Sequence, residues 1–168
     1  MPDRPAFRVR PATPNDAPLL AKHRIEMFRD MFHARGRQVD DGAAEALRLA
    51  AEPMLHEWVT AGSYVGWLAE PPTRPGLVVG GAGVQLRPML PRFNPDGSAV
   101  MSGPEAYVLN VFVERAWRHR GVATLLMDSV ITFARERRIR LVSLHASDEG
   151  RPLYERLGFL PTNEMRLG

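Results

Sequence analysis

The chain has 168 residues and a formal net charge of +3, because 22 Lys and Arg residues outnumber 19 Asp and Glu residues. It contains no cysteine, which excludes disulfides, thiolate metal sites and a cysteine nucleophile. With 45% hydrophobic residues it can bury a substantial core, yet it is short for two domains, so we expect one domain over residues 1–168. No apolar run approaches the roughly 20 residues of a membrane helix, and "MPDRPAFRVR" has no signal core, which predicts a soluble, cytoplasmic protein without a membrane partner.

The first half of the chain has patterns that are typical of strands before and after a helical region. Residues 6–13, "AFRVRPAT", alternate apolar and charged side chains as a strand does. Thr13 has the hydroxyl of a helix cap, and apolar residues at helical spacing then predict a helix over roughly 15–33. Residues 64–70 and 77–90 indicate two strands that flank a proline-rich turn, which favours a hairpin.

A second helical region covers residues 37–62, and one long connection follows the hairpin. Asp40 or Asp41 would cap the helical region, and Pro53 is predicted to break or kink it. Residues 87–104 show no periodicity, and a loop of that length is either functional and mobile or an insertion without a role.

The second half carries the strongest patterns in the chain. Residues 105–114, "EAYVLNVFVE", are apolar on both faces and predict a central strand. After Gly121 an apolar stripe at helical spacing predicts an amphipathic helix. Residues 140–146 then predict a buried strand, residues 147–158 a short capped helix, and residues 159–167 a final strand or strand pair.

The stretch "RHRGVA", residues 118–123, joins the central strand to this helix and favours an anion site. The first four N–H groups of a helix have no partner within it, and they lie at the positive end of the helix dipole. Gly121 and Ala123 leave the approach open, and the neighbouring arginines add charge, so we expect a phosphate or diphosphate here. A Walker loop is absent, and the glycines of residues 80–83 precede a strand where a dinucleotide motif requires a helix.

The pattern Arg-x-x-Gly-x-Ala at Arg118, Gly121 and Ala123, after a buried strand and at the opening of a helix, resembles the acetyl-coenzyme A (acetyl-CoA) motif of the GNAT superfamily of N-acetyltransferases. Further on, "RLVSLHASDEGRPLYERLGF" resembles the second landmark of that family, a strand followed by a short helix with Tyr and Leu-Gly-Phe. The resemblance implies an α/β (α+β) GNAT fold: a mixed central sheet of about six strands, flanking helices and a splayed pair of parallel strands.

The resemblance also implies the cofactor and where it binds. The cofactor is acetyl-CoA, and no metal is expected. Its pantetheine arm would bond to the backbone of the central strand, and its diphosphate would lie on the N–H groups from Arg118 to Thr124. Ser147 stands where many members have an Asn that contacts coenzyme A (CoA). The implied cofactor-binding residues are Val111, Phe112, Val113, Arg118, His119, Arg120, Gly121, Val122, Ala123, Thr124 and Ser147.

The implied activity is direct transfer of the acetyl group to a primary amine of a small molecule or peptide. Such a transfer needs no protein nucleophile, in agreement with the missing cysteine, but it needs a proton donor for the leaving thiolate. Tyr154 matches the family's donor position; alternatively, it is a packing residue. A GNAT-fold module that binds an acyl-CoA and regulates or senses without turnover is the alternative function.

The general base stays open at this point. Tyr107 stands where histone-type relatives place a glutamate, so their mechanism is not transferable. Glu105, Glu114 and His145 are candidates, and ordered water could also take the proton. Asn110 interrupts an apolar strand, so it either marks the bulge that separates the strands or lines the substrate cleft.

The acceptor and the oligomeric state are less defined by the sequence. In relatives the first two helices and the loop before the central strand line the acceptor pocket, which directs attention to His23, Arg24, Met27, Phe28, Met31, Trp67 and residues 87–104. The basic segment "RERRIR" lies at the end of a predicted helix, where its positive charges interact favourably with the negative end of the helix dipole. No recognition motif accompanies it, so no nucleic-acid partner is expected. Only ten residues follow Gly158, and a homodimer could cover the sheet edge that the family's longer tail would cover.

Overall fold

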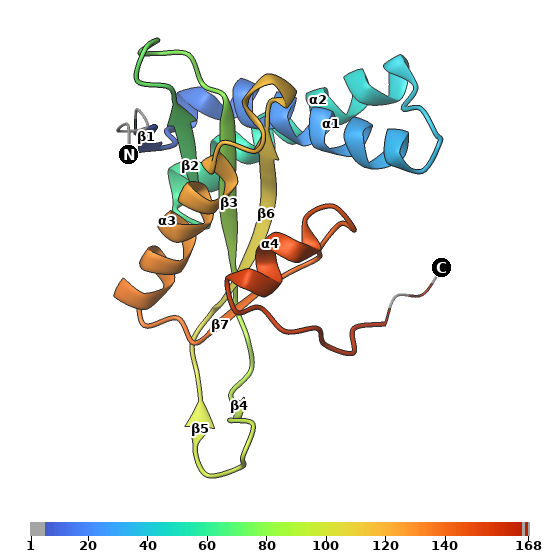
Figure 1. Ribbon diagram of the computed structural model, residues 1–168. Helices are drawn as coiled ribbons and strands as arrows, with labels where there is room; N and C mark the ends of the chain where they lie inside the picture. The colour runs from blue at the N-terminus through green and yellow to red at the C-terminus, as the bar shows by residue number, and fades with distance from the viewer. Residues whose placement is uncertain (1–5, 166, 168) are drawn as a thin grey trace.

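A computed structural model of the protein describes residues 6–165 and residue 167 (Figure 1). Its centre is a mixed five-stranded sheet in the order β1-β2-β3-β6-β7, in which β6 and β7 are parallel and all other neighbours are antiparallel. The sequence predicted about six strands, and the difference arises at the C-terminal end of the chain. The strands are β1 (Arg8–Pro11), β2 (Tyr64–Glu70), β3 (Gly80–Arg87), β6 (Glu105–Val113) and β7 (Leu141–Leu144).

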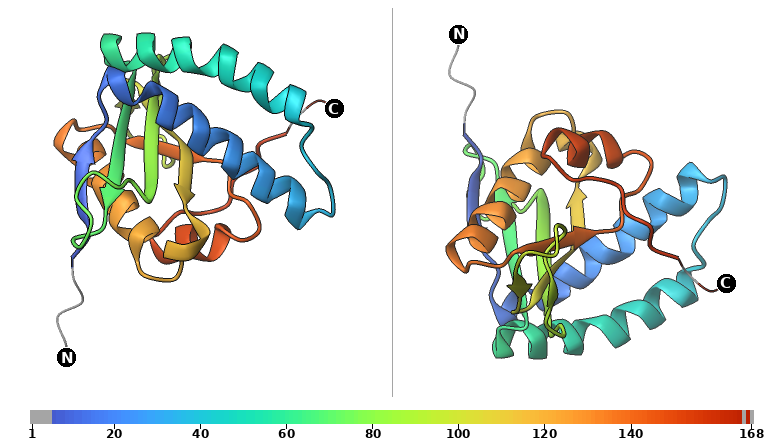
Figure 2. Two further views of the ribbon diagram at one scale, coloured as in Figure 1. Left: turned by 90° about the horizontal axis from the view of Figure 1, so that it is seen from above. Right: turned by 90° about the horizontal axis from the view of Figure 1, so that it is seen from below.

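Helices cover both faces of this sheet (Figure 2). One face carries α1 (Ala17–Ala34) and α2 (Asp41–Ala61), and the other carries α3 (Val122–Glu136) and α4 (Arg151–Arg156). Two 3-10 turns, Pro14–Asp16 and Arg115–Trp117, precede α1 and α3. The predicted first helix and the helix after Gly121 are therefore confirmed. None of the helices in the described residues is both long and apolar enough to cross a membrane.

The second helix begins where the sequence placed its cap but does not break at Pro53. Asp40 Oδ1 accepts a hydrogen bond from the N–H of Ala43 over 2.9 Å, which satisfies one of the free donors of the first turn. The helix then runs through Pro53 to Ala61, so of the predicted break or kink the break does not occur. Leu49, whose carbonyl loses the hydrogen bond that Pro53 cannot donate, is 60% exposed, and water can replace the missing donor.

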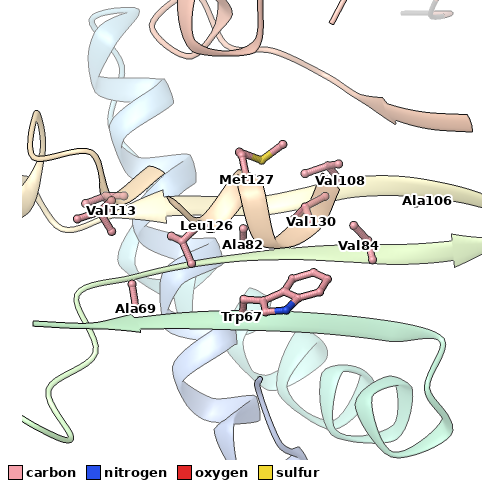
Figure 3. Close-up of a cluster of buried hydrophobic side chains, with 11 residues drawn as sticks. Trp67, Ala69, Ala82, Val84, Ala106, Val108, Val113, Leu126, Met127 and Val130 are labelled. Carbon is pink, nitrogen blue, oxygen red and sulfur yellow. The ribbon is translucent and has the colours of Figure 1, made fainter. Parts of the chain in front are cut away.

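Each face of the sheet has its own apolar core. Trp67 of β2 and alternate residues of β3 and β6 pack against Val122, Leu126, Met127 and Val130 of α3, as Figure 3 shows for this cluster. On the opposite face Leu20 of α1 and Leu55 of α2 pack against Tyr64 and Leu68 of β2. Side chains of a strand alternate between faces, so β2 contributes to both cores. The sheet is therefore anchored on both sides.

Two segments differ from the pattern that the sequence predicted. Residues 87–104 are not irregular throughout: β4 (Arg92–Phe93) and β5 (Val100–Met101) form a short ribbon that projects beyond the sheet (Figure 1). The final strand predicted over residues 159–167 does not form in residues 159–165 or at residue 167; residue 166 lies outside the described residues. Leu160 is 83% exposed, so little apolar burial is available to hold this segment on the sheet.

Candidate active site

The central strand β6 contains a bulge at Asn110. Its register against β3 shifts between Leu109, which pairs with Gly83, and Phe112, which pairs with Gly81, so two residues of β6 oppose the single Ala82 of β3. Asn110 has a φ of 57°, a left-handed conformation that is uncommon for a side chain other than glycine. Because of the extra residue, the side chains after the bulge lie on the opposite face of the sheet from the one that strict alternation along β6 would give them. The side chains of Leu109 and Asn110 consequently both lie on the face of α1 and α2.

A hydrogen-bonded chain of side chains holds this bulge. Tyr64 of β2 reaches across β3 at Gly83, where the missing side chain leaves room for the phenol ring. Asn110 Nδ2 donates to the Tyr64 hydroxyl over 3.4 Å, and Asn110 Oδ1 accepts from Arg24 of α1 over 2.9 Å. Burial raises the pKa of Tyr64 to about 12, so its hydroxyl stays protonated. Of the two roles left open for Asn110, the geometry favours the structural one.

The parallel strands β6 and β7 separate next to the bulge. They pair from Glu105 with Leu141 to Val108 with Leu144, after which β6 continues to Val113 without a β7 partner in the described residues. The splayed pair of strands expected from the sequence is therefore present. It leaves backbone groups of β6 from Leu109 onward open on the side of β7, which is where a ligand can bond as an additional strand does.

The connection from β6 to α3 keeps a series of backbone donors free. Gly121 caps α3 with a φ of 84°, and a Cβ at this position would meet no atom within 4 Å. The N–H of Arg118 donates to the carbonyl of Arg115 over 3.3 Å, so it is not available as the sequence had led us to expect. From His119 to Thr124, no N–H has an acceptor within the described part of the chain. Six successive donors at the positive end of a helix form an anion site.

The arginines of this connection do not all add charge to that site. Arg118 donates to the carbonyl of Val113 over 2.9 Å and pairs with Asp30 of α1, which also binds Arg115 over 2.6 Å. These hydrogen bonds outweigh burial and lower the pKa of Asp30. Arg120 stacks 5.2 Å above the ring of Trp117. The charge of Arg118 is therefore balanced by Asp30, a residue that sequence reasoning missed because it lies 88 positions away.

Tyr154 lies half-buried on α4, the helix that follows β7. Its ring packs edge-on against Phe159, with 5.9 Å between ring centres, and against Gly150. Its hydroxyl has no hydrogen-bond partner among the described residues, and burial raises the pKa of the phenol. Ser147 Oγ accepts from the N–H of Gly150 over 3.1 Å, so it closes the turn before α4.

The candidate bases occupy different places. Tyr107 Oη contacts His145 Nδ1, and Nε2 of this exposed histidine lies 2.9 Å from a carboxylate oxygen of Glu164. Glu105 accepts a hydrogen bond from Ser143, so its carboxylate is engaged. Glu114 lies beyond the end of β6, beside the connection that leads to α3. Sequence reasoning named His145 but not its contact with Tyr107, which depends on the pairing of β6 with β7.

The residues expected to line the acceptor pocket are only partly brought together. Arg24 lies at the bulge with its guanidinium 5.0 Å from the ring centre of Phe28. His23, which is 1% exposed, packs 5.2 Å from the ring of Phe112, and neither ring nitrogen has a hydrogen-bond partner among residues 6–165 or at residue 167. Trp67 lies on the opposite face of the sheet, in the core under α3 (Figure 3), so it does not lie with His23 and Arg24.

A surface groove of about 250 Å³ lies elsewhere, between α1 and α2. Charged side chains line much of it, and Arg29 and Arg48 are already paired there with Asp41 and Glu45. The groove does not include the bulge of β6 or the open donors of the connection to α3. We therefore place the candidate site at the splay of β6 and β7.

The chain belongs to the acetyltransferase (GNAT) family, whose family model matches residues 26–159. A GCN5-related N-acetyltransferase from Ralstonia eutropha is similar over 97% of this chain and 98% of its own, with 29% identity and a TM-score of 0.82. A predicted acetyltransferase from Clostridium acetobutylicum, solved with acetyl-CoA, covers 97% and 96%, with 24% identity and a TM-score of 0.77.

A more distant structural match is an aminoglycoside N-acetyltransferase in complex with CoA. It is 18% identical, covers 100% of this chain and 97% of its own, and has a TM-score of 0.65, so it supports the fold alone. No curated protein sequence matches the chain. The GNAT fold expected from the sequence is thus confirmed, whereas the fold does not identify an acceptor.

Proposed function

We propose that the protein transfers an acetyl group from acetyl-CoA directly to a primary amine of a small molecule or peptide. The observation that carries the proposal is the series of free N–H groups from His119 to Thr124, placed next to the unpaired part of β6. In this proposal residues 1–168 act as one domain in the cytoplasm, a reducing compartment that suits a chain without cysteine. Membership of the GNAT family and the similar structures with acetyl-CoA or CoA support it.

The residues at the site fit acetyl-CoA. Its diphosphate carries negative charge, and the donors from His119 to Thr124 lie at the positive end of α3. The open space around Gly121 leaves the approach free. Val111, Phe112 and Val113, on the stretch of β6 without a β7 partner, would bond through their backbone to the pantetheine arm. Acetyl-CoA supplies the acyl group as a thioester.

The transfer itself forms a C–N bond and breaks a C–S bond. The nitrogen of the acceptor loses one proton, and the sulfur of the departing CoA gains one. The protein contributes by holding the amine and the thioester together and by providing groups for both protons. Tyr154 would donate the proton to sulfur, because burial keeps its phenol protonated and its hydroxyl has no other partner among the described residues.

His145 is the group that we propose for the proton of the amine. It is exposed, it contacts Tyr107 on the face of the sheet that carries the bulge, and Glu164 lies beside its other nitrogen. Glu105 stays the alternative base, because Ser143 bonds only one oxygen of its carboxylate. Asn110 would maintain the bulge instead of contacting the proton in transfer, since both ends of its amide are bonded.

Thiol release from acetyl-CoA, measured with a panel of primary amines, tests the proposal. Amine-dependent release, together with calorimetric binding of CoA, is expected. Binding of CoA without release for any amine would instead indicate the non-catalytic acyl-CoA-binding module. Absence of CoA binding would contradict both functions.

A further inference from the structure

Arg24 is a half-buried cation at the bulge of β6. Its guanidinium donates to Asn110 and lies over Phe28, and no carboxylate in the described residues contacts it. Burial lowers its pKa, and the phenols of Tyr64 and Tyr107 act in the opposite direction. An arginine nevertheless stays protonated at physiological pH. A full positive charge therefore stands at the bulge without an opposite charge from the described part of the chain.

Other arginines that contact α1 are neutralised within the protein. Arg29 pairs with Glu26 over 2.9 Å, and Arg118 pairs with Asp30. Taking a charge partly out of water without an opposite charge is unfavourable, so an unpaired half-buried cation suggests a functional reason. Arg24 is half-buried, and the two groups that hold it, the amide oxygen of Asn110 and the ring of Phe28, carry no net charge. We therefore expect a bound ligand to supply the negative charge that pairs with Arg24.

The position of Arg24 indicates whether this negative charge comes from CoA or from the acceptor. In the proposed function the diphosphate of CoA lies on the donors of residues 119–124, at the far end of the connection that leaves β6. Arg24 instead lies at the bulge, on the face that carries Tyr107 and His145. On the same face the guanidinium of Arg87 stacks 3.5 Å above the ring of Tyr107, so a second positive charge lies nearby. The anion is thus expected from the acceptor.

We propose that the acceptor amine carries an oxyanion, a carboxylate or a phosphate, and that Arg24 binds it. The proposal rests on the proposed function and names its substrate class: small amino carboxylates or amino phosphates. Only one N–H of the guanidinium is used by Asn110, so the others can form the forked contacts that planar oxyanions accept. Acceptors that carry only positive charge, such as aminoglycosides, are disfavoured by the same residue.

Calorimetry with the CoA-saturated protein tests the proposal without requiring turnover. The probes are matched pairs: an α-amino acid and the amine that remains after its decarboxylation, and glucosamine 6-phosphate and glucosamine. The wild type is compared with Arg24→Gln, which can still donate to Asn110, and with Arg29→Gln as a control on the same helix. We expect the anionic member of at least one pair to bind at least tenfold more tightly, and the pair identifies carboxylate or phosphate.

In Arg24→Gln this preference should disappear, while binding of CoA stays within twofold of wild type and binding of the member without the oxyanion does not weaken. Arg29→Gln should keep the preference. If neither pair shows a preference, or if Arg24→Gln retains it or weakens both members equally, the proposal is wrong, and in the last case Arg24 only positions Asn110. Failure of the proposed function is seen separately, as absence of thiol release in the presence of an amine that binds.

Discussion

Gly83 of β3 provides the space that the side chain of Tyr64 occupies. A Cβ at position 83 would overlap the hydroxyl and the adjoining ring carbon of this buried tyrosine. The hydroxyl of Tyr64 accepts a hydrogen bond from the amide of Asn110. A substitution in β3 that displaces Tyr64 is therefore expected to disturb the bulge of β6 as well.

Gly83→Ala should therefore destabilise the protein by about 3 kcal/mol, the upper part of the range for overpacking a core. Chemical denaturation measures this loss. The same substitution in a Tyr64→Leu background should cost much less, because the smaller side chain leaves room for the methyl group. An equal cost in both backgrounds would show that overlap with Tyr64 is not the cause.

The free donors before α3 predict how Gly121 contributes to CoA binding. Gly121→Val should weaken CoA binding at least tenfold in calorimetry, because the branched side chain enters the anion site and disfavours the φ of 84°. Pantetheine, which lacks the diphosphate, should bind as it does to wild type. Gly97→Val, at a φ of 73° in the ribbon, imposes similar backbone strain away from the site and should leave CoA binding unchanged.

The assignment of Tyr154 as proton donor predicts a specific loss. Tyr154→Phe should lower kcat by about 10²-fold, the lower end of the range for general acid–base catalysis, without changing the Kd for CoA. An acetyl thioester with a more acidic thiol should be affected less, because its leaving group needs less assistance. Unchanged kcat with acetyl-CoA would reduce Tyr154 to a packing residue.

The buried His23 predicts a loss of stability in mild acid. Burial, with a smaller effect of Lys22, lowers its pKa from 6.5 to about 4, so below pH 6.5 the unfolded chain binds a proton that the folded protein does not. The free energy of unfolding should therefore fall by up to about 3 kcal/mol between pH 7 and pH 4. His23→Met should flatten this part of the curve in denaturation experiments.

The acid limb at lower pH has a different origin and serves as an internal control. Asp16, bound by Arg10, has its pKa lowered to about 2, so its contribution is present above about pH 4 and is lost as the pH falls toward 2. This lower limb should be the same in wild type and in His23→Met. If His23→Met left the whole profile unchanged, the buried histidine would not be the source of the upper limb.

The outer edge of β7 predicts self-association. No strand covers this edge in the described residues, because residues 159–165 do not form the predicted final strand. An open edge exposes backbone donors and acceptors that another strand can pair with. We expect a homodimer in sedimentation velocity at micromolar concentration, and a monomer there would remove the hypothesis.

Local features of the site followed from the sequence because neighbouring residues create them. The free donors around Gly121 arise wherever a strand runs into a helix through "RHRGVA", and the helical periodicity after it needs no distant partner. The acetyltransferase resemblance depended on these local patterns, and the family and fold comparisons confirmed it. The strand predicted over residues 159–167 does not form in the described part of that segment, where the exposed Leu160 offers little apolar burial.

Only the tertiary structure decided which distant side chains meet. The pairing of Arg118 with Asp30, the bond from Arg24 to Asn110 and the contact of Tyr107 with His145 each join segments that are 38 or more positions apart. The sequence alone did not separate Trp67 from His23 and Arg24, because alternation along a strand divides its residues between two faces but does not say which helices cover each face. The sequence predicted where backbone donors stay free before α3, because such donors are a local feature. The arrangement of charge around the acceptor depends on packing between elements, and that arises only when the sheet and its helices are assembled.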